Sequence, residues 1–183
     1  MYVIPDSSFF ICFLDDLEGH MPISDRVRIL TLITGNLTVL VVPEVEVESR
    51  FSRIPSPVRA QIQMVKIPAS GTRSDPAIEL LRPLLGKGEY EVISCACIYF
   101  LNGDVTGLFI LDDGVARDLV KRILPSIISH MKGTVGFIGY CTVQKVLEKN
   151  EGIHLLTVIG RSKFRVDQST IATVIAGVQN RCV

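Results

Sequence analysis

The sequence predicts an α/β protein, a three-layer α/β/α sandwich whose central sheet is mainly parallel. Short apolar runs rich in β-branched residues, typical of buried strands, alternate with segments whose apolar residues recur at helical spacing. This alternation predicts a parallel sheet that helices cover on both faces. The 183 residues contain no repeat and no low-complexity segment. We therefore expect one domain, with residues 153–183 as a C-terminal extension packed on it.

The first half of the chain begins with an apolar strand. A serine is expected to cap the helix that follows, and Gly35 to end the next one. Pro43, followed by glutamates, suits the first turn of a third helix. The predicted elements are strands at 2–4 and 37–42, helices at 7–17, at 25–34 and from 43, a bend with a short helix at 53–61, an edge strand at 63–68 and a polar loop at 69–76.

In the second half, a glycine-framed acidic turn at 86–89 opens an apolar helix. Two aspartates end the next strand, and a basic helix follows them. The predicted elements are a helix at 77–86, the central helix after it, a strand at 107–111, a helix from 114, a strand near 127–129, a helix from the glycine turn at 133 to Gly152, and a final helix that Asp167 or Ser169 caps.

Composition argues against several classes of protein. Lysine plus arginine equal aspartate plus glutamate, at 19 each, so no global positive field indicates a nucleic-acid partner. No apolar run reaches the roughly 18 residues that span a bilayer, and the first residues lack the basic segment of a secretory signal. Five cysteines, at spacings that match no metal pattern, indicate reduced core thiols. We expect a cytoplasmic protein with no membrane partner.

Acidic residues stand where predicted strands end and predicted helices begin. Asp6 follows the first strand, Glu48 lies about a turn into the helix after the second, and Glu91 lies near the start of the central helix. Asp112 and Asp113 follow the strand at 107–111. Sites in parallel sheets form beyond the carboxyl ends of the strands. We therefore expect Asp6, Glu48, Glu91 and Asp113 to meet there.

Carboxylates that meet in this way raise one another's pKa values, and a divalent cation removes the conflict. Oxygen-only ligands favour Mg²⁺ or Mn²⁺ over zinc. Such a site can activate water and stabilise a phosphoryl oxygen during phosphodiester hydrolysis. Taken singly, each acid also suits a helix cap or a solvated helix start. The residues that compete for one role are Glu44, Glu46 and Glu48; Glu89 and Glu91; and Asp112 and Asp113.

Six blocks are spread along the chain: V-I-P-D-S-S (3–8), V-P-E-V-E-V-E (42–48), L-G-K-G-E-Y-E-V-I-S-C-A (85–96), I-L-D-D-G-V-A-R (110–117), K-G-T-V-G (132–136) and K-F-R-V-D (163–167). Together they resemble the PIN-domain ribonucleases, a family that includes the VapC-type toxins of prokaryotic toxin–antitoxin pairs. The middle blocks are the specific ones, because they are similar to the Gly-Glu-x-Glu-Ala-Ile, Asp-Asp-x-x-Ala-Arg and Gly-Thr-x-Gly blocks of one VapC-like subgroup.

The resemblance implies a PIN-like α/β/α fold, a Mg²⁺ or Mn²⁺ site and cleavage of single-stranded RNA. It also implies a homodimer, often with an antitoxin protein as partner. Carried over by position, the catalytic acids would be Asp6, Glu48, Glu91 and Asp113, with Asp6, Glu91 and Asp113 as metal ligands. The supporting residues would be Ser8, Glu89, Asp112 and Thr134.

Two other readings compete with a metal-dependent endoribonuclease. A PIN-like module that binds RNA or a protein without cutting fits the neutral net charge. A phosphorylated receiver domain is disfavoured, because no aspartate stands near the predicted strand at 63–68. Arg117, Lys121 and Arg122 can contact phosphates but better suit a solvated helix face. The three histidines have no partners at ligand spacing.

Overall fold

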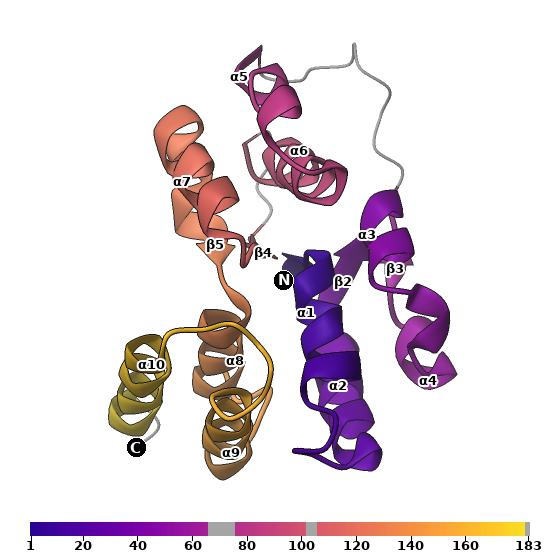
Figure 1. Cartoon of the computed structure of the whole chain (residues 1–183), viewed down its shortest axis with the longest axis vertical. Helices are drawn as coiled ribbons and strands as arrows, with labels where there is room; N and C mark the ends of the chain where they lie inside the picture. Colours follow the sequence, from indigo (N-terminus) through magenta and orange to yellow (C-terminus); the bar gives the residue numbers. More distant parts are fainter. Residues whose placement is uncertain (66–75, 102–105, 182–183) are drawn as a thin grey trace.

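The structure of the chain is a computed structural model that describes residues 1–65, 76–101 and 106–181 (Figure 1). Within these ranges, five strands form one parallel sheet in the order β3-β2-β1-β4-β5. The strands are β1 (Tyr2–Ile4), β2 (Thr38–Val41), β3 (Gln63–Met64), β4 (Gly107–Ile110) and β5 (Met131–Lys132). β1 lies at the centre, with Val3 opposite Val39 of β2 and Leu108 of β4.

Helices cover the sheet on both faces. They are α1 (Ser7–Ile11), α2 (Ile23–Asn36), α3 (Pro43–Glu48), α4 (Ser56–Arg59), α5 (Pro76–Glu79), α6 (Lys87–Leu101), α7 (Gly114–Ile123), α8 (Thr134–Val143), α9 (Lys149–Ile159) and α10 (Gln168–Arg181). α6 packs on β1 and β4, and it lies across the strands from α1, α2 and α8 (Figure 1). The predicted α/β class with a parallel central sheet is therefore confirmed, and the arrangement is compatible with three layers.

An aromatic cluster packs the first helix against α8. Phe9 of α1 has its ring centre 5.2 Å from that of Phe10, 5.3 Å from that of Phe13 and 5.8 Å from that of Phe137 in α8. All four side chains are buried. Because α1 begins directly after Asp6, this packing also fixes the position of the Asp6 backbone.

Several predicted elements end or begin elsewhere, mostly at proline. The prediction of a strand near 127–129 is wrong, because Pro125 opens a 3₁₀ turn (Pro125–His130) and the strand begins only at Met131. The helix expected at 77–86 is interrupted, because Pro83 lies in a separate 3₁₀ turn (Arg82–Leu84). The expected loop at 69–76 lies outside the described residues except for Pro76, which opens α5, and the edge strand at 63–68 is described only at its start.

Three helix boundaries also differ from expectation. Asp6, rather than a serine, caps α1, and α2 continues through Gly35. The helix expected to run to Gly152 is two helices, α8 and α9, separated near Lys145, which has a left-handed φ of 60°. Gly152 lies inside α9, where an added Cβ would collide with Thr142 of α8. Close approach of the two helices therefore explains this glycine.

The last two helices, α9 and α10, pack on α8 and on each other. Gly139 of α8 lies against Val174 of α10, so close that an added Cβ would collide with it. Cys12, Cys95, Cys97 and Cys141 are buried, whereas Cys182 lies outside the described residues. In the part of the chain that the structure covers, no helix is both long and apolar enough to cross a bilayer.

Candidate functional site

The carboxyl ends of β1 and β4 lie side by side at the centre of the sheet. The chain leaves β1 toward β2 on one side, and β4 occupies the other side. In open parallel sheets, ligands bind in the crevice beyond such a reversal of strand order. Asp6 follows β1 after Pro5, and Asp112 follows β4 after Leu111. The topology therefore places two carboxylates at the position where this fold builds sites.

Asp6 is bound directly to the end of β4. Its side chain is buried, with the residue 4% exposed, and its backbone N–H donates to the Ile110 carbonyl at 3.2 Å. One carboxylate oxygen accepts from the Phe9 N–H at 3.2 Å, which caps α1, and the other accepts from the Asp112 N–H at 2.9 Å. Each oxygen keeps a further lone pair. Asp6 is therefore held rigidly and still has acceptor capacity for a ligand.

Asp112 continues this network to the third strand end. Its Oδ1 accepts from the Thr134 N–H at 2.8 Å, and its Oδ2 accepts from the Thr134 hydroxyl at 2.5 Å. Thr134 is fully buried at the start of α8, just beyond β5. Asp6, Asp112 and Thr134 thus form one chain of hydrogen bonds across the carboxyl ends of β1, β4 and β5.

The electrostatics of this network favour a bound cation. Burial, followed by the negative charge of Asp112, raises the pKa of Asp6 well above its usual range, and the charge of Glu89 adds to the effect. Burial likewise raises the pKa of Asp112, although its bonds from Thr134 and the charge of Arg117 act in the opposite direction. Arg117 donates one of its five guanidinium N–H groups to the Leu111 carbonyl at 2.9 Å.

A pocket of about 530 Å³ opens beside this network. Carboxylates from several elements and two cations from the segment between α9 and α10 share its wall. The residues that line it are Ser8, Ile11, Asp16, Glu89, Asp112, Asp113, Gly114, Lys163, Phe164 and Arg165. The pocket therefore combines an acidic side, next to Asp6, with a basic side that a distant part of the chain supplies.

The choice between Glu89 and Glu91 depends on how α6 is rotated about its axis. Residues two apart on an α-helix point about 200° apart, so only one of the two can face Asp6. Glu89 lines the pocket, and its charge acts on Asp6. Glu91 instead accepts from the Glu44 N–H at 2.8 Å, at the start of α3. Glu89 is therefore the glutamate nearer to Asp6, and the prediction that Glu91 lies there is wrong.

Glu48 also makes its contacts away from the expected meeting point. Its carboxylate lies against Gly88, where an added Cβ would come within 2.5–2.9 Å of it. Glu44 forms an ion pair with Lys87, whose pKa is raised by that bond first and then by the charges of Glu44, Glu91 and Glu48. These three glutamates therefore join α3 to the start of α6. The prediction that Glu48 lies beside Asp6 is wrong, because Glu48 contacts Gly88 of α6 instead.

Asp113 and Ser8 both line the pocket, but each differs in detail from its expected role. Asp113 is exposed, and its Oδ1 accepts from the Ala116 N–H at 2.7 Å as the cap of α7. The member of the aspartate pair that contacts Asp6 is Asp112. Ser8 is predicted to support Asp6, but the hydrogen bonds to that carboxylate come from the backbone of Phe9 and Asp112.

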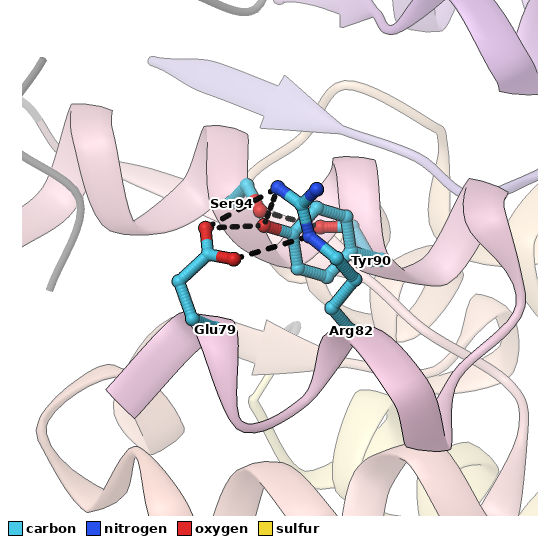
Figure 2. Close-up of polar contacts among 4 residues, drawn as sticks. All are labelled: Glu79, Arg82, Tyr90 and Ser94. Atoms are coloured by element: carbon cyan, nitrogen blue, oxygen red, sulfur yellow. Dashed lines mark hydrogen bonds and ion pairs between the residues drawn. The ribbon is translucent and has the colours of Figure 1, made fainter. Parts of the chain in front are cut away.

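Residues of α5 and of the 3₁₀ turn after it contact the first turns of α6. Figure 2 shows Glu79 and Arg82 reaching Tyr90, with Ser94 one turn further along the helix. The Arg82 guanidinium lies 5.0 Å from the centre of the Tyr90 ring and donates to the Tyr90 hydroxyl at 3.1 Å, while that hydroxyl donates to Glu79 at 3.0 Å. These contacts join the segment at 79–82 to α6 one residue after Glu89.

Sequence reasoning missed three charged residues of the pocket wall, Asp16, Lys163 and Arg165. Asp16 ends a π-helical turn (Cys12–Asp16), and burial, followed by the charge of Asp15, raises its pKa, whereas Lys163 lowers it. The block at 163–167 enters the resemblance only as a closing segment. Nothing in the local pattern indicates that it folds back to the sheet edge.

Among the residues that the structure describes, no three His, Cys, Asp or Glu side chains are arranged to hold a metal ion. The acids of the pocket therefore share a wall without converging on one point. No family model, curated protein or solved structure matches the chain.

Proposed function

We propose that the protein is a divalent-metal-dependent endoribonuclease that hydrolyses phosphodiester bonds of single-stranded RNA. The observation that carries the proposal is the hydrogen-bonded pair of Asp6, which is buried, and Asp112, which is half-buried, at the reversal of strand order. Burial and the charge of Asp112 make ionised Asp6 unfavourable, and either a proton or a cation beside the pair relieves this. The resemblance of the sequence blocks to PIN-domain ribonucleases supplies the reaction and the substrate.

The donor set fits Mg²⁺ or Mn²⁺. Asp6, Asp112 and Glu89 offer only carboxylate oxygens, and hard divalent cations prefer such oxygens, whereas zinc sites commonly include histidine or cysteine. Asp6 and Asp112 would hold the ion, and Glu89 would support them from α6 through its negative charge. The bound ion supplies Lewis-acid activation of water and neutralises phosphate charge.

The protein's own groups have separate tasks in this proposal. Asp6 and Asp112 are held in place by backbone N–H donors and by Thr134, so their oxygens do not have to reorganise when the ion binds. Asp113 and Asp16 add negative charge at the pocket wall and can accept a proton or a water hydrogen. This preorganisation is what a phosphodiesterase site requires.

Cleavage of a labelled single-stranded RNA in Mn²⁺ or Mg²⁺ tests the proposal, with Glu89→Gln and Glu91→Gln as matched variants two residues apart. Glu89→Gln should lower the cleavage rate about 10–100-fold, the range for weakened metal-site support. Glu91→Gln should leave the rate within about 2-fold, because Glu91 contacts the start of α3. Equal rates for the wild type and Glu89→Gln, or no cleavage by the wild type with either metal, would contradict the proposal.

A second candidate is a PIN-like module that binds RNA or a protein without cutting it. It is favoured by the absence, among the described side chains, of three acids already converged on one point. The same assay separates the two, because a silent module binds RNA but leaves it intact. A homodimer and an antitoxin partner are parts of the proposal that come from the resemblance alone.

A further inference from the structure

The segment between α9 and α10 places two cations on the wall of the acidic pocket. Lys163 and Arg165 line the pocket together with Glu89, Asp112 and Asp113. Both side chains belong to exposed residues. Within the described ranges, no hydrogen bond or ion pair holds the Lys163 ammonium or the Arg165 guanidinium. The charge of Lys163 acts on Asp16 of the same wall, whose pKa it lowers, but both cations are exposed and can reach a ligand in the pocket.

The backbone that carries these cations is packed in place. Phe164 and Val166 are half-buried and pack against the hydrophobic core, and the Phe164 N–H donates to the Ser162 hydroxyl at 3.1 Å. In this turn, Lys163 and Arg165 are exposed, whereas Phe164 and Val166 between and after them are half-buried. A pair of cations on a fixed backbone loses less conformational entropy on binding than a pair on a free tail.

The charge pattern of the pocket indicates the ligand. Lys163 and Arg165 repel a divalent ion, so metal binding does not account for their presence at the pocket. They would instead attract an anion that lies over the metal-holding acids. We propose that Lys163 and Arg165 bind backbone phosphates of the RNA strand, one on each side of Phe164, and so position the strand over Asp6 and Asp112. This inference rests on the proposed function for the identity of the polyanion.

Lysine and arginine bind phosphate in different ways. The Arg165 guanidinium can donate two parallel hydrogen bonds to one phosphate, whereas the Lys163 ammonium acts as a point charge. Neither group reads a base, so the pair should bind RNA of any sequence. Together with a cation held by the acids, the pair would offset the four carboxylates of the pocket wall, Asp16, Glu89, Asp112 and Asp113, in a chain that has no net charge.

The experiment measures binding of a short fluorescein-labelled single-stranded RNA in Ca²⁺, which takes carboxylate ligands, and follows the intactness of the RNA on a gel. The variants are Lys163→Ala, Arg165→Ala and the double variant. The matched control is Arg161→Ala, an exposed arginine of the same segment that does not line the pocket. The double Lys163→Arg, Arg165→Lys variant keeps both charges.

Each single variant should raise Kd about 5–10-fold. The double variant should make the slope of log K against log[salt] shallower by about 1.4, because each of the two phosphates that it no longer neutralises on a single strand contributes about 0.7. Arg161→Ala should leave Kd within about 2-fold, and the charge-keeping double variant should retain most of the affinity. Unchanged Kd and slope in the double variant, an equal loss in Arg161→Ala, or no binding by the wild type would overturn the inference.

The two proposals fail separately. Weaker binding by the double variant, in a protein whose wild type never cuts RNA in Mn²⁺ or Mg²⁺, supports the phosphate-binding role and contradicts the nuclease. Metal-dependent cleavage with unchanged binding in the double variant supports the nuclease and contradicts the phosphate-binding role.

Discussion

Asp6→Asn should lower the rate of RNA cleavage by about 100-fold or more while the protein stays folded. The expected loss exceeds the 10–100-fold typical of residues that only support a metal ligand, because Asp6 is proposed as a ligand itself. The measurement is the initial rate of cleavage of a labelled single-stranded RNA in saturating Mn²⁺. Asp118→Asn is the matched control, since Asp118 is an exposed residue of α7 in contact with Lys121.

Asparagine at position 6 can accept only one of the two N–H groups that the Asp6 carboxylate accepts, from Phe9 and Asp112. The variant therefore loses a hydrogen bond, at a cost of about 1–3 kcal/mol in the free energy of unfolding. Circular dichroism at the assay temperature separates this cost from lost chemistry. A folded Asp6→Asn protein that cuts RNA at the wild-type rate would remove Asp6 from the catalytic site.

Asp112→Asn should also abolish cleavage, yet it should make the metal-free protein more stable at pH 8. The asparagine side chain of this variant can keep both bonds to Thr134, because its oxygen accepts from the N–H and its amide donates to the hydroxyl oxygen. The backbone N–H of residue 112 still donates to Asp6. The substitution thus removes one negative charge from beside Asp6 and leaves the hydrogen-bond network in place.

The sign of the pH dependence follows from the direction of the pKa shifts. Burial raises the pKa of Asp6 and of Asp112 in the folded protein above the value of about 3.9 in an unfolded chain. A carboxyl whose pKa is higher in the folded protein than in the unfolded chain contributes its full stabilisation below about pH 4. This stabilisation is lost as the pH rises through the pKa of the folded state. The wild type should therefore lose more stability between pH 5 and pH 8 than Asp112→Asn, since it carries one more such group.

Thermal unfolding in EDTA at pH 5 and pH 8 measures this difference. We expect Asp112→Asn to have the higher Tm at pH 8, by about 2–4 °C for each kcal/mol in a protein of this size. Asp113→Asn should leave Tm nearly unchanged, because asparagine caps a helix as well as aspartate does and Asp113 is exposed. A lower Tm for Asp112→Asn at both pH values would show that the pair is not under electrostatic strain.

The sheet could be predicted because its strands carry their own signal. The apolar runs at 2–4, 37–42 and 107–111 are continuous, as expected for strands buried on both faces, and each corresponds to an observed strand. The error near 127–129 arises where apolar residues follow Pro125 and favour a strand by composition. The proline starts a 3₁₀ turn there, and the pairing with β4 begins only at Met131.

Chain order indicates that Asp6 lies near the aspartate pair, because parallel strands end at the same edge, but the pattern favours Asp113 whereas Asp112 makes the contact. The finer choices could not be made from the sequence. Which of Glu89 and Glu91 faces the pocket depends on the rotation of α6, which follows from the packing of its buried residues, among them Val92, Ile93 and Ala96. Lys163 and Arg165 reach the pocket through the path of the chain after α9, which no local pattern indicates.

The central claim is that Asp6 and Asp112 form a pair that a divalent cation stabilises, and calorimetric titration with Mn²⁺ at pH 6 and pH 8 tests it most directly. Because the cation binds the ionised carboxylates and their pKa values are raised, binding should be tighter at pH 8 and should release protons. Asp112→Asn should not show this binding. The absence of Mn²⁺ binding by the wild type at either pH, or equal binding by Asp112→Asn, would contradict the claim.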